Sequence, residues 1–525
     1  MTHVRKIAEI YKEIDNKSSS VKLDNEDYFI TTNNLTTNIG LEQELILLTP
    51  KNEAYKEFQD KVVLGLIATA IFFIIILPFV LYLINLLIKP ISQLIIENEK
   101  IINKDYDNVQ IVNTRLKELK SLSKSLYIMS KSIKEYKENQ DRFVDGFISM
   151  ISKAIDDKSP YTGGHCHKIP IIMNLIVEAA SKSQDEVFKE FRNLTKEEIR
   201  QIEVAAKLHD CGKITTPEYV MDKSVKLETI YNRIHEIRTR FEVIYRDLKI
   251  KALENLVKNE DKIILEKDLQ IELNKLQNEF AFIAQCNIGS EFLSNDAKDK
   301  IQNIAKKEWT RYFDDSLGLS NEEKKRYIKP ISNQEYLLDD KINHIVKREF
   351  FDFAEFEKFG FKMEVPNNLY NFGEIYNLCI EKGTINKEER FKINEHITAT
   401  IKMLESLPFP KNLSKVIEFA GNHHETLIGT GYPRKLTKNE MSLTSRMMAL
   451  ADIFEALSSN DRPYKDTKKL SEVLKIMSYF VKDKHIDEDV FKLFIEEKIY
   501  LKYANNYLKK EQIDLENIEE VLKNL

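Results

Sequence analysis

The chain has 525 residues, of which 42% are hydrophobic and 31% charged, so it can form several folded domains and is not disordered as a whole. Its 79 basic and 84 acidic residues leave a net charge of −5, which excludes a protein whose main task is to coat nucleic acid polymers. Only 14 Gly and 12 Pro are present, and this scarcity favours long helices over a turn-rich β architecture.

The first strongly marked element is a transmembrane helix over residues 62–88. These 27 residues carry no charge and are bounded by Lys61 and Lys89. About 20 apolar residues suffice to cross a bilayer as a helix, and a buried core helix would be shorter. Residues 1–61 contain β-like runs, and we interpret them as an extracytoplasmic segment, the remnant of a sensor domain whose beginning is missing.

Residues 89–141 are predicted to form a coiled linker with two short helices. A polar break at residues 103–108 separates the helices, and the second one carries apolar residues at intervals of three and four, as in a coiled-coil seam. The seam residues are Leu116, Leu119, Leu122, Leu126, Met129 and Ile133. This arrangement resembles a HAMP linker, a parallel four-helix bundle formed by two chains; a plain juxtamembrane coiled coil is the alternative. Both interpretations imply a homodimer.

Residues 142–525 are expected to form a mainly helical domain. Thr195 with Glu198 is a capping box that predicts a helix start, and this helix is expected to end near Gly212. Asn386 with Glu389 predicts a second start. Between about residues 229 and 373 lies a highly charged helical insertion without a catalytic pattern, and its role is left open.

Histidine and aspartate side chains occur in short motifs of this domain. The residues with metal-ligand chemistry are His165, His209, Asp210, His396, His423, His424 and Asp452. Imidazole and carboxylate donors without a thiolate pattern suit a divalent first-row metal and disfavour a structural zinc site. Five His and two Asp suffice for two ions that share a carboxylate. Two ions about 3.5–4 Å apart suit phosphodiester hydrolysis, because they lower the pKa of a bridging water and hold phosphate oxygens.

The order of these motifs resembles that of one known family. The motifs are Tyr161-Thr162-Gly163-Gly164-His165, His209-Asp210-Cys211-Gly212-Lys213, His396, His423-His424-Glu425, Gly429-Thr430-Gly431-Tyr432-Pro433, and Asp452 through Arg462-Pro463-Tyr464-Lys465. The ordered set resembles the HD-GYP family, cyclic di-GMP phosphodiesterases of the metal-dependent HD superfamily, over about residues 142–228 and 374–525. The resemblance implies an all-helical HD-type phosphohydrolase domain, here preceded by the transmembrane helix and the HAMP-like linker.

The resemblance also implies the ligand set of each metal. The ligands of one metal would be His165, His209, Asp210 and Asp452, and those of the second would be Asp210, as a bridge, with His396, His423 and His424. Members of the family with three metals carry a Glu where this chain has Tyr161, so a site for two ions is expected. Fe or Mn is the first expectation, and Zn or Ni stays open.

Further residues match the family's catalytic and substrate-binding positions. Lys213 matches the lysine beside the scissile phosphate, where it would act in catalysis together with Asp210. Tyr432, Arg462 and Lys465 match residues that hold the dinucleotide, for which the fixed donor fork of arginine is well suited. Solvated surface charges are the alternative for Arg462 and Lys465.

The sequence thus predicts a membrane-bound phosphodiesterase that hydrolyses cyclic di-GMP to pGpG, with GMP as an open further product. Because cyclic di-GMP is made and used in the cytosol, the catalytic domain would lie there, anchored by a single pass through the cytoplasmic membrane. Two alternatives remain: a receptor module that binds cyclic di-GMP without hydrolysing it, and an HD phosphohydrolase acting on another cyclic nucleotide.

Overall fold

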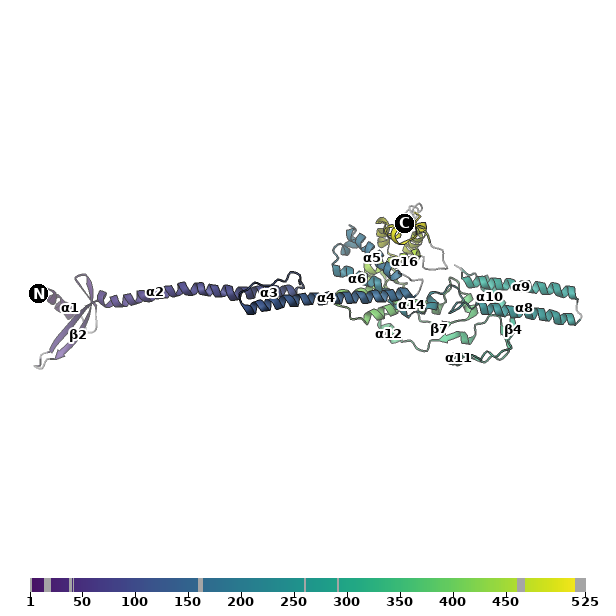
Figure 1. Ribbon diagram of the computed structural model, residues 1–525, viewed down its shortest axis with the longest axis horizontal. Helices are drawn as coiled ribbons and strands as arrows, with labels where there is room; N and C mark the ends of the chain where they lie inside the picture. The colour runs from purple at the N-terminus through teal and green to yellow at the C-terminus, as the bar shows by residue number, and fades with distance from the viewer. Residues whose placement is uncertain are drawn as a thin grey trace. The chain divides into compact units, whose positions relative to one another are not determined.

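The computed structural model describes residues 2–13, 20–36, 40, 42–158, 164–258, 261–289, 292–459 and 468–514. The chain divides into two compact units, Met1–Arg142 and Phe143–Leu525. Helices dominate both units, as the ribbon in Figure 1 shows, and the predicted fold class, mainly α, is confirmed.

The first unit begins with a helix and a small antiparallel sheet. Helix α1 (Thr2–Glu13) precedes three strands in the order β1-β2-β3, whose bounds are Ser20–Leu23, Glu26–Thr36 and Glu42–Pro50. Strand β3 pairs along its whole length with β2, from Tyr28 opposite Pro50 to Thr36 opposite Glu42. The β-like runs of the sequence lie in these two strands.

A long apolar helix follows the sheet. Helix α2 (Lys51–Leu83) continues through a π-helical turn (Ile84–Ile88) into α3 (Lys89–Ile102). Among the described residues, Lys51–Ile102 is the one helix long and apolar enough to cross a membrane, by length and composition only. Its most apolar part is not buried by other parts of the chain. The predicted span, residues 62–88, lies inside it.

A loop connects α3 to the 42-residue helix α4 (Lys117–Lys158) and packs back against both. Val109 and Val112 of the loop are buried with Leu94 of α3. The backbone N–H of Val112 donates to Ser123 Oγ of α4 at 2.7 Å. The helix–break–helix pattern is therefore present, with the break where the sequence places it. That this segment is a HAMP linker stays a prediction.

The second unit is built around a large helical core. Its helices are α5 (His165–Lys182), α6 (Lys196–Leu208), α14 (Lys387–Glu405), α15 (Val416–Gly421), α16 (Leu443–Ser458), α17 (Leu470–Lys482), α18 (Glu488–Glu496) and α19 (Ile499–Tyr507). Ile169, Met173 and Ile176 lie on one face of α5 at intervals of three and four and pack in one apolar cluster with Met447 and Phe454 of α16. Helices α5, α6 and α16 thereby pack together, and this packing positions the polar residues on them and at their ends.

Both predicted helix starts are present. Thr195 and Asn386 each form the full capping box, with Glu198 and Glu389 as partners. The expected end near Gly212 is wrong, because α6 stops at Leu208 and a short 3-10 helix (Cys211–Thr215) follows. The chain turns there to pass tightly against α14: a Cβ atom on Gly212 would lie 1.9 Å from the carbonyl oxygen of His396.

The insertion is helical only in part. Its helices are α8 (Ile234–Val257), α9 (Lys262–Ile288), α10 (Asn295–Ala305), α11 (Asn321–Arg326) and α12 (Phe353–Lys358), with α7 (Glu218–Met221) before it and α13 (Glu374–Leu378) after it. Residues 306–373 also form two small antiparallel sheets, β4 (Glu308–Thr310) with β5 (Gln334–Tyr336) and β6 (Ile345–Lys347) with β7 (Asn368–Asn371). The predicted helical insertion is thus helical mainly in its first part, since Pro330, Pro366, Gly318 and Gly360 interrupt any long helix in residues 306–373.

Candidate metal centre

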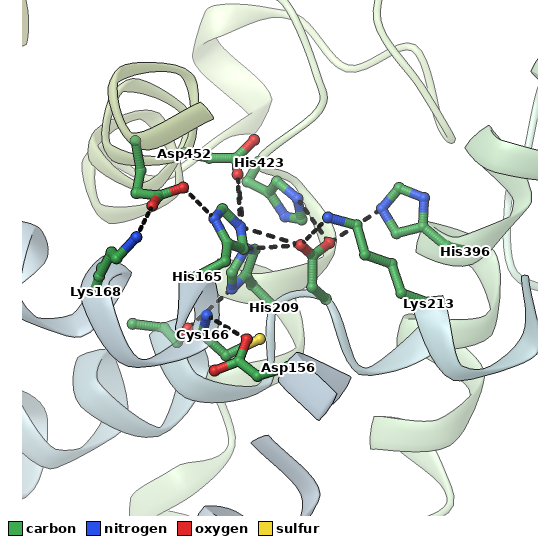
Figure 2. A network of polar contacts seen from close by, with 12 residues as sticks. Asp156, His165, Cys166, Lys168, His209, Lys213, His396, His423 and Asp452 are labelled. Carbon is green, nitrogen blue, oxygen red and sulfur yellow. Dashed lines mark hydrogen bonds and ion pairs between the residues drawn. The ribbon is translucent and has the colours of Figure 1, made fainter. Parts of the chain in front are cut away.

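The structure brings all seven predicted metal ligands together in two groups that share one carboxylate. The first group is His165, His209, Asp210 and Asp452, and the second is Asp210, His396, His423 and His424. Within each group, one donor atom of every residue lies within 4.8 Å of those of the others. Figure 2 shows five of these side chains gathered around one centre, those of His165, His209, His396, His423 and Asp452.

Helix ends and helix faces place these ligands. His165 is the first residue of α5, and His209 directly follows α6. Asp452 lies on α16, and His396 lies on α14. His423 and His424 come directly after Asn422, the residue that caps α15. Five of the seven ligands are buried, and His424 and Asp452 are partly buried, which limits the access of bulk water to the donor atoms.

The two oxygens of Asp210 face different groups. Oδ2 lies 3.2 Å from Nε2 of His165 and 3.2 Å from Nε2 of His209. Oδ1 lies 3.2 Å from Nε2 of His396 and 4.0 Å from Nε2 of His423. A carboxylate in this position can contribute one oxygen to each of two cations.

The imidazole rings are held so that the same nitrogen faces the centre each time. In His209, His396 and His423, Nδ1 lies 2.9, 2.5 and 2.6 Å from the backbone carbonyl oxygen three residues earlier. A carbonyl oxygen only accepts hydrogen bonds, so each Nδ1 carries the hydrogen and each Nε2 keeps a lone pair directed at the centre. Such outer contacts are the usual means of orienting a metal-ligating histidine.

His165 obtains its orientation from a side chain instead. Its Nδ1 lies 2.6 Å from Oε2 of Glu455, whose Oε1 lies 3.2 Å from Nζ of Lys168. Sequence reasoning missed Glu455. The signal was its spacing: Asp452 and Glu455 are three residues apart on α16 and therefore lie on one face of that helix.

The donor atoms fit a pair of divalent cations. Nε2 of His165 and Nε2 of His209 lie 3.1 Å apart, as do those of His396 and His424. Two imidazole lone pairs directed at each other repel, so a proton or a metal cation must lie between the nitrogens of each pair. Nε2 of His423 is also buried and has no hydrogen-bond partner among the described residues, which is costly unless a ligand satisfies it. Nitrogen and carboxylate donors of this kind suit first-row metals.

The charges in the centre differ between the groups. Burial opposes a charge on His209, but Asp210 and Asp452 outweigh it and raise its pKa to about 9. Burial lowers the pKa of His423 to about 4, and the positive charge of His209 adds to this effect. Burial also opposes ionisation of Asp210, but Lys213 and His209 hold its pKa well below the usual range.

Lys213 lies beside the shared carboxylate, with its Nζ 2.5 Å from Oδ2 of Asp210. The last turn of α4 supports this part of the centre. Nζ of Lys158 donates to the carbonyl oxygens of Lys213, at 3.0 Å, and of Ile214. Oδ1 of Asp156 accepts the backbone N–H of Cys166 at 3.0 Å, at the start of the helix that carries His165 (Figure 2). Sequence reasoning missed both α4 residues.

Tyr432 adjoins the second group. Its ring stacks on the ring of His424 with centroids 4.8 Å apart and an angle of 24°. Burial raises the pKa of Tyr432, so its hydroxyl stays protonated. Behind it, the buried carboxylate of Glu425 accepts the backbone N–H groups of Arg434 and Leu436 at 2.6 and 2.9 Å and so fixes the return of this loop.

The remaining predicted site residues give a mixed picture. Arg462, Lys465 and Tyr161 lie outside the described residues, so their roles stay predictions. Cys166 and Cys211 are buried and unpaired with each other, as expected of small core residues. The roles assigned to the seven ligands and to Lys213 also stay predictions, now with a geometry in which they can act together.

A comparison with protein families matches part of the chain. Residues 341–490 match the family model described as HD domain. The match contains His396, His423, His424 and Asp452; it begins inside the predicted insertion and leaves out His165 and the His209–Asp210 pair.

Curated relatives point the same way. The chain is 33% identical over 148 residues to a 3'3'-cGAMP-specific phosphodiesterase of Vibrio cholerae, covering 26% of this chain and 33% of the relative. It is 30% identical over 135 residues to a cyclic di-GMP phosphodiesterase of Pseudomonas aeruginosa (26% and 29%) and 31% identical over 122 residues to one of Thermotoga maritima (23% and 33%). The chain spans about a third of the length of these relatives. The comparisons confirm its resemblance to HD-GYP-type phosphodiesterases.

Proposed function

We propose that this chain is a metal-dependent phosphodiesterase that hydrolyses a cyclic dinucleotide, with cyclic di-GMP as substrate and pGpG as product. The observation that supports it most strongly is the position of Asp210, whose two oxygens face two separate groups of histidines. A centre for one ion has no need of this second face. The names of the relatives support the same class of reaction.

The chain's own residues would divide the work as follows. The two ligand groups would hold two divalent ions, Fe or Mn, which supply Lewis acidity and a water-derived nucleophile near neutral pH. Lys213 would neutralise charge that develops on the phosphate, because its compact ammonium group already lies against Asp210. Tyr432 would stack with or hydrogen-bond to the dinucleotide beside the second group.

The choice of substrate has a second candidate. Relatives named for 3'3'-cGAMP make that dinucleotide a second candidate. Arg462 and Lys465 would contribute to substrate choice by contacts to phosphate or guanine edges. A receptor that binds without hydrolysis is disfavoured, since such a module has no use for seven inward-facing metal ligands.

We also propose that the enzyme is anchored in the cytoplasmic membrane through residues 62–88 and works as a homodimer. Apolar seam residues of α4 are exposed in the single chain, among them Leu122 at 50% and Met129 at 44%. A second copy of the linker would cover them. The catalytic unit would then lie in the cytosol, where cyclic dinucleotides are available.

The activity test uses the full-length chain in detergent, purified without oxygen and loaded with Fe or Mn. The parent and Asp210→Ala are incubated with cyclic di-GMP and with 3'3'-cGAMP, separately and in competition, and the products are separated by chromatography. We expect pGpG from the parent, none from the variant, and a preference for cyclic di-GMP. A parent that holds two metal ions and binds the dinucleotide without forming product contradicts the proposal and supports the receptor alternative.

The anchoring and the dimer are tested separately. After carbonate extraction of membranes, the full-length chain should remain in the pellet, and its release into the supernatant would contradict an integral span. Leu122→Cys should form a disulfide-linked dimer on mild oxidation, whereas Lys124→Cys, on another face of α4, should do so far less. Equal cross-linking of both variants would contradict a specific seam.

A further inference from the structure

One segment of the insertion lies directly against the loop that carries Tyr432. We call residues 351–362 the strap; it consists of α12 and the residues on either side of it. The comparisons and the sequence motifs assign it no role. Its contacts are of two kinds, apolar packing against α14 and polar contacts to the Tyr432 loop.

The apolar contacts form a compact aromatic cluster. Phe356 and Phe361 are buried, with 7% and 6% of their surface exposed, and pack with Ile397 and Ile401 of α14. Tyr432 packs against the same cluster. Ile397 directly follows the metal ligand His396, so the strap contacts the helix face next to that ligand as well as the tyrosine.

The polar contacts connect the strap to Pro433 and Arg434, the two residues that follow Tyr432. The backbone N–H of Lys362 donates to the carbonyl oxygen of Pro433 at 2.7 Å. In return, Nε of Arg434 donates to the carbonyl oxygen of Phe359 at 3.0 Å, and its guanidinium group lies 5.8 Å from the ring centre of Phe361. One contact is backbone to backbone and the other runs from the Arg434 side chain to the strap backbone, so the strap and the loop are joined at two points.

A further ion pair anchors the strap to α14. Glu355 of the strap contacts Lys402, about one and a half turns beyond His396 on that helix. The strap is thus held at α14 and at the Tyr432 loop, the two elements that border the second ligand group. None of these contacts involves α5, α6 or α16, which position the first group.

We propose that the strap positions Tyr432 over His424 and thereby sets the affinity for the dinucleotide, so that Phe361 and Arg434 are positioning residues of the enzyme. The inference rests on the proposed function. The physical reason is that the hydrogen bonds within the loop hold its backbone, whereas the apolar cluster of the strap packs against the side chain of Tyr432. Without the strap, Glu425 still holds the base of the loop, while the ring loses the surface behind it.

The test measures kcat and KM of the full-length, metal-loaded protein with cyclic di-GMP. For Phe361→Ala and Arg434→Ala we expect KM to rise about tenfold or more, with kcat changed by less than about threefold and two metal ions retained. Phe361→Leu, which keeps much of the apolar volume, should restore KM to within about twofold. The matched control is Phe241→Ala, which removes an equally buried phenylalanine from another cluster of the insertion. It should lower thermal stability and leave KM unchanged.

The outcomes separate the inference from the proposed function. If the parent is active and both strap variants keep the parental KM, the strap has only a structural role and the inference is wrong, while the phosphodiesterase proposal stands. If the parent is inactive, the proposed function fails. The inference is then tested by calorimetry: the dissociation constant for cyclic di-GMP should rise about tenfold or more in Phe361→Ala and Arg434→Ala and stay within about twofold in Phe361→Leu. If Phe361→Ala does not fold, Arg434→Ala, which alters a half-buried side chain, gives the answer.

Discussion

The two halves of the metal centre use the same donor chemistry on different scaffolds. In the first half, His165, His209 and Asp452 stand on helices that pack into the main apolar core. In the second half, His396 and His424 are bordered by the small aromatic cluster of the strap and by the loop of Tyr432. Asp210 belongs to both. Helices α14 and α15 also contribute Leu404 and Phe419 to the main core, so the second half shares this support but depends in addition on a loop and on the strap.

This difference indicates how the centre can combine a constant reaction with an adjustable substrate site. Displacing a ligand of the first half means disturbing a close-packed core, which proteins resist strongly. A shift of the strap changes only the border of the second half. The predictions below start with the residue that the halves share and proceed to effects that separate them.

The largest effect is expected for Asp210→Asn. The variant keeps the volume of the side chain and removes the charge that both ligand groups share, so both metal ions should be lost. Loss of Lewis-acid stabilisation is worth several kcal/mol, and activity should fall on the order of 10³-fold. Metal analysis of the purified variant checks the first expectation and product formation the second. Retention of either ion at the parental level would show that one half is complete without the shared carboxylate.

Glu455→Gln should separate the halves. The substitution removes the charge that orients His165 and leaves the second group untouched. Loss of such an outer partner typically lowers metal affinity about 10–100-fold, and we expect this for one ion of the two. Chelator titration followed by metal analysis measures it. Glu374→Gln is the matched control, because Glu374, directly after the insertion, is a buried, ion-paired carboxylate; it should leave both affinities unchanged.

Gly212→Ala tests the contact at which the halves meet. The new Cβ would lie 1.9 Å from the carbonyl oxygen of His396 and 2.5 Å from the backbone nitrogen of Thr400, so the 3-10 helix and α14 must move apart. Overpacking of this kind costs about 1–3 kcal/mol of unfolding free energy. Thermal or denaturant unfolding measures the loss.

The control for this variant is Gly146→Ala. Gly146 lies in α4 with no atom within 4 Å of an added Cβ. Replacing a helical glycine there should stabilise the protein by about 0.5–1 kcal/mol. Equal effects of the two substitutions would mean that the approach of the loop to α14 is looser than the structure shows.

The smallest effect is a difference in pH dependence. A histidine must lose its proton before it binds a metal, and the pKa of His209 is raised to about 9 while that of His423 is lowered to about 4. As the pH falls below about 9, protons therefore compete for the first half, and its affinity should drop by about tenfold per pH unit. In the second half, protons should not compete for His423 until the pH falls to about 4. His396→Ala and His165→Ala isolate the halves for this titration, and parallel curves would contradict the assignment.

The sequence predicted which candidate ligands would come together, but not the residues that hold them in place. His165, His209, His396 and the His423–His424 pair lie in short motifs whose residue types limit the possible chemistry, so their meeting in space could be predicted. Asp156 and Lys158 reach the centre from the end of α4, and no local pattern marks a contact that depends on how two distant segments pack. The helix starts at Thr195 and Asn386 were predictable because capping is local, whereas the end of α6 is set by the passage of Gly212 against α14.

The aromatic residues of the strap were visible in the sequence but carried no signal of their role. Phenylalanines at 351, 356 and 361 fit neither a helix period nor a strand period over the whole segment. Their partners are on α14 and on the Tyr432 loop, both later in the chain. Tertiary packing, and not local propensity, therefore decides the form of this part of the insertion.

The backbone carbonyl groups that orient the histidines make part of the centre insensitive to amino-acid substitution. His209 and His423 are oriented by carbonyl groups in the last turns of α6 and α15, which have no partner further along their own helices. No single amino-acid replacement can delete a carbonyl oxygen, so these rings keep their acceptor whatever side chains drift around them. His165, at the start of its helix, depends on Glu455, an acceptor that a single codon change can remove. Random mutagenesis should accordingly find inactive variants at position 455 and few at Ala206 or Ala420 among substitutions that fit the space.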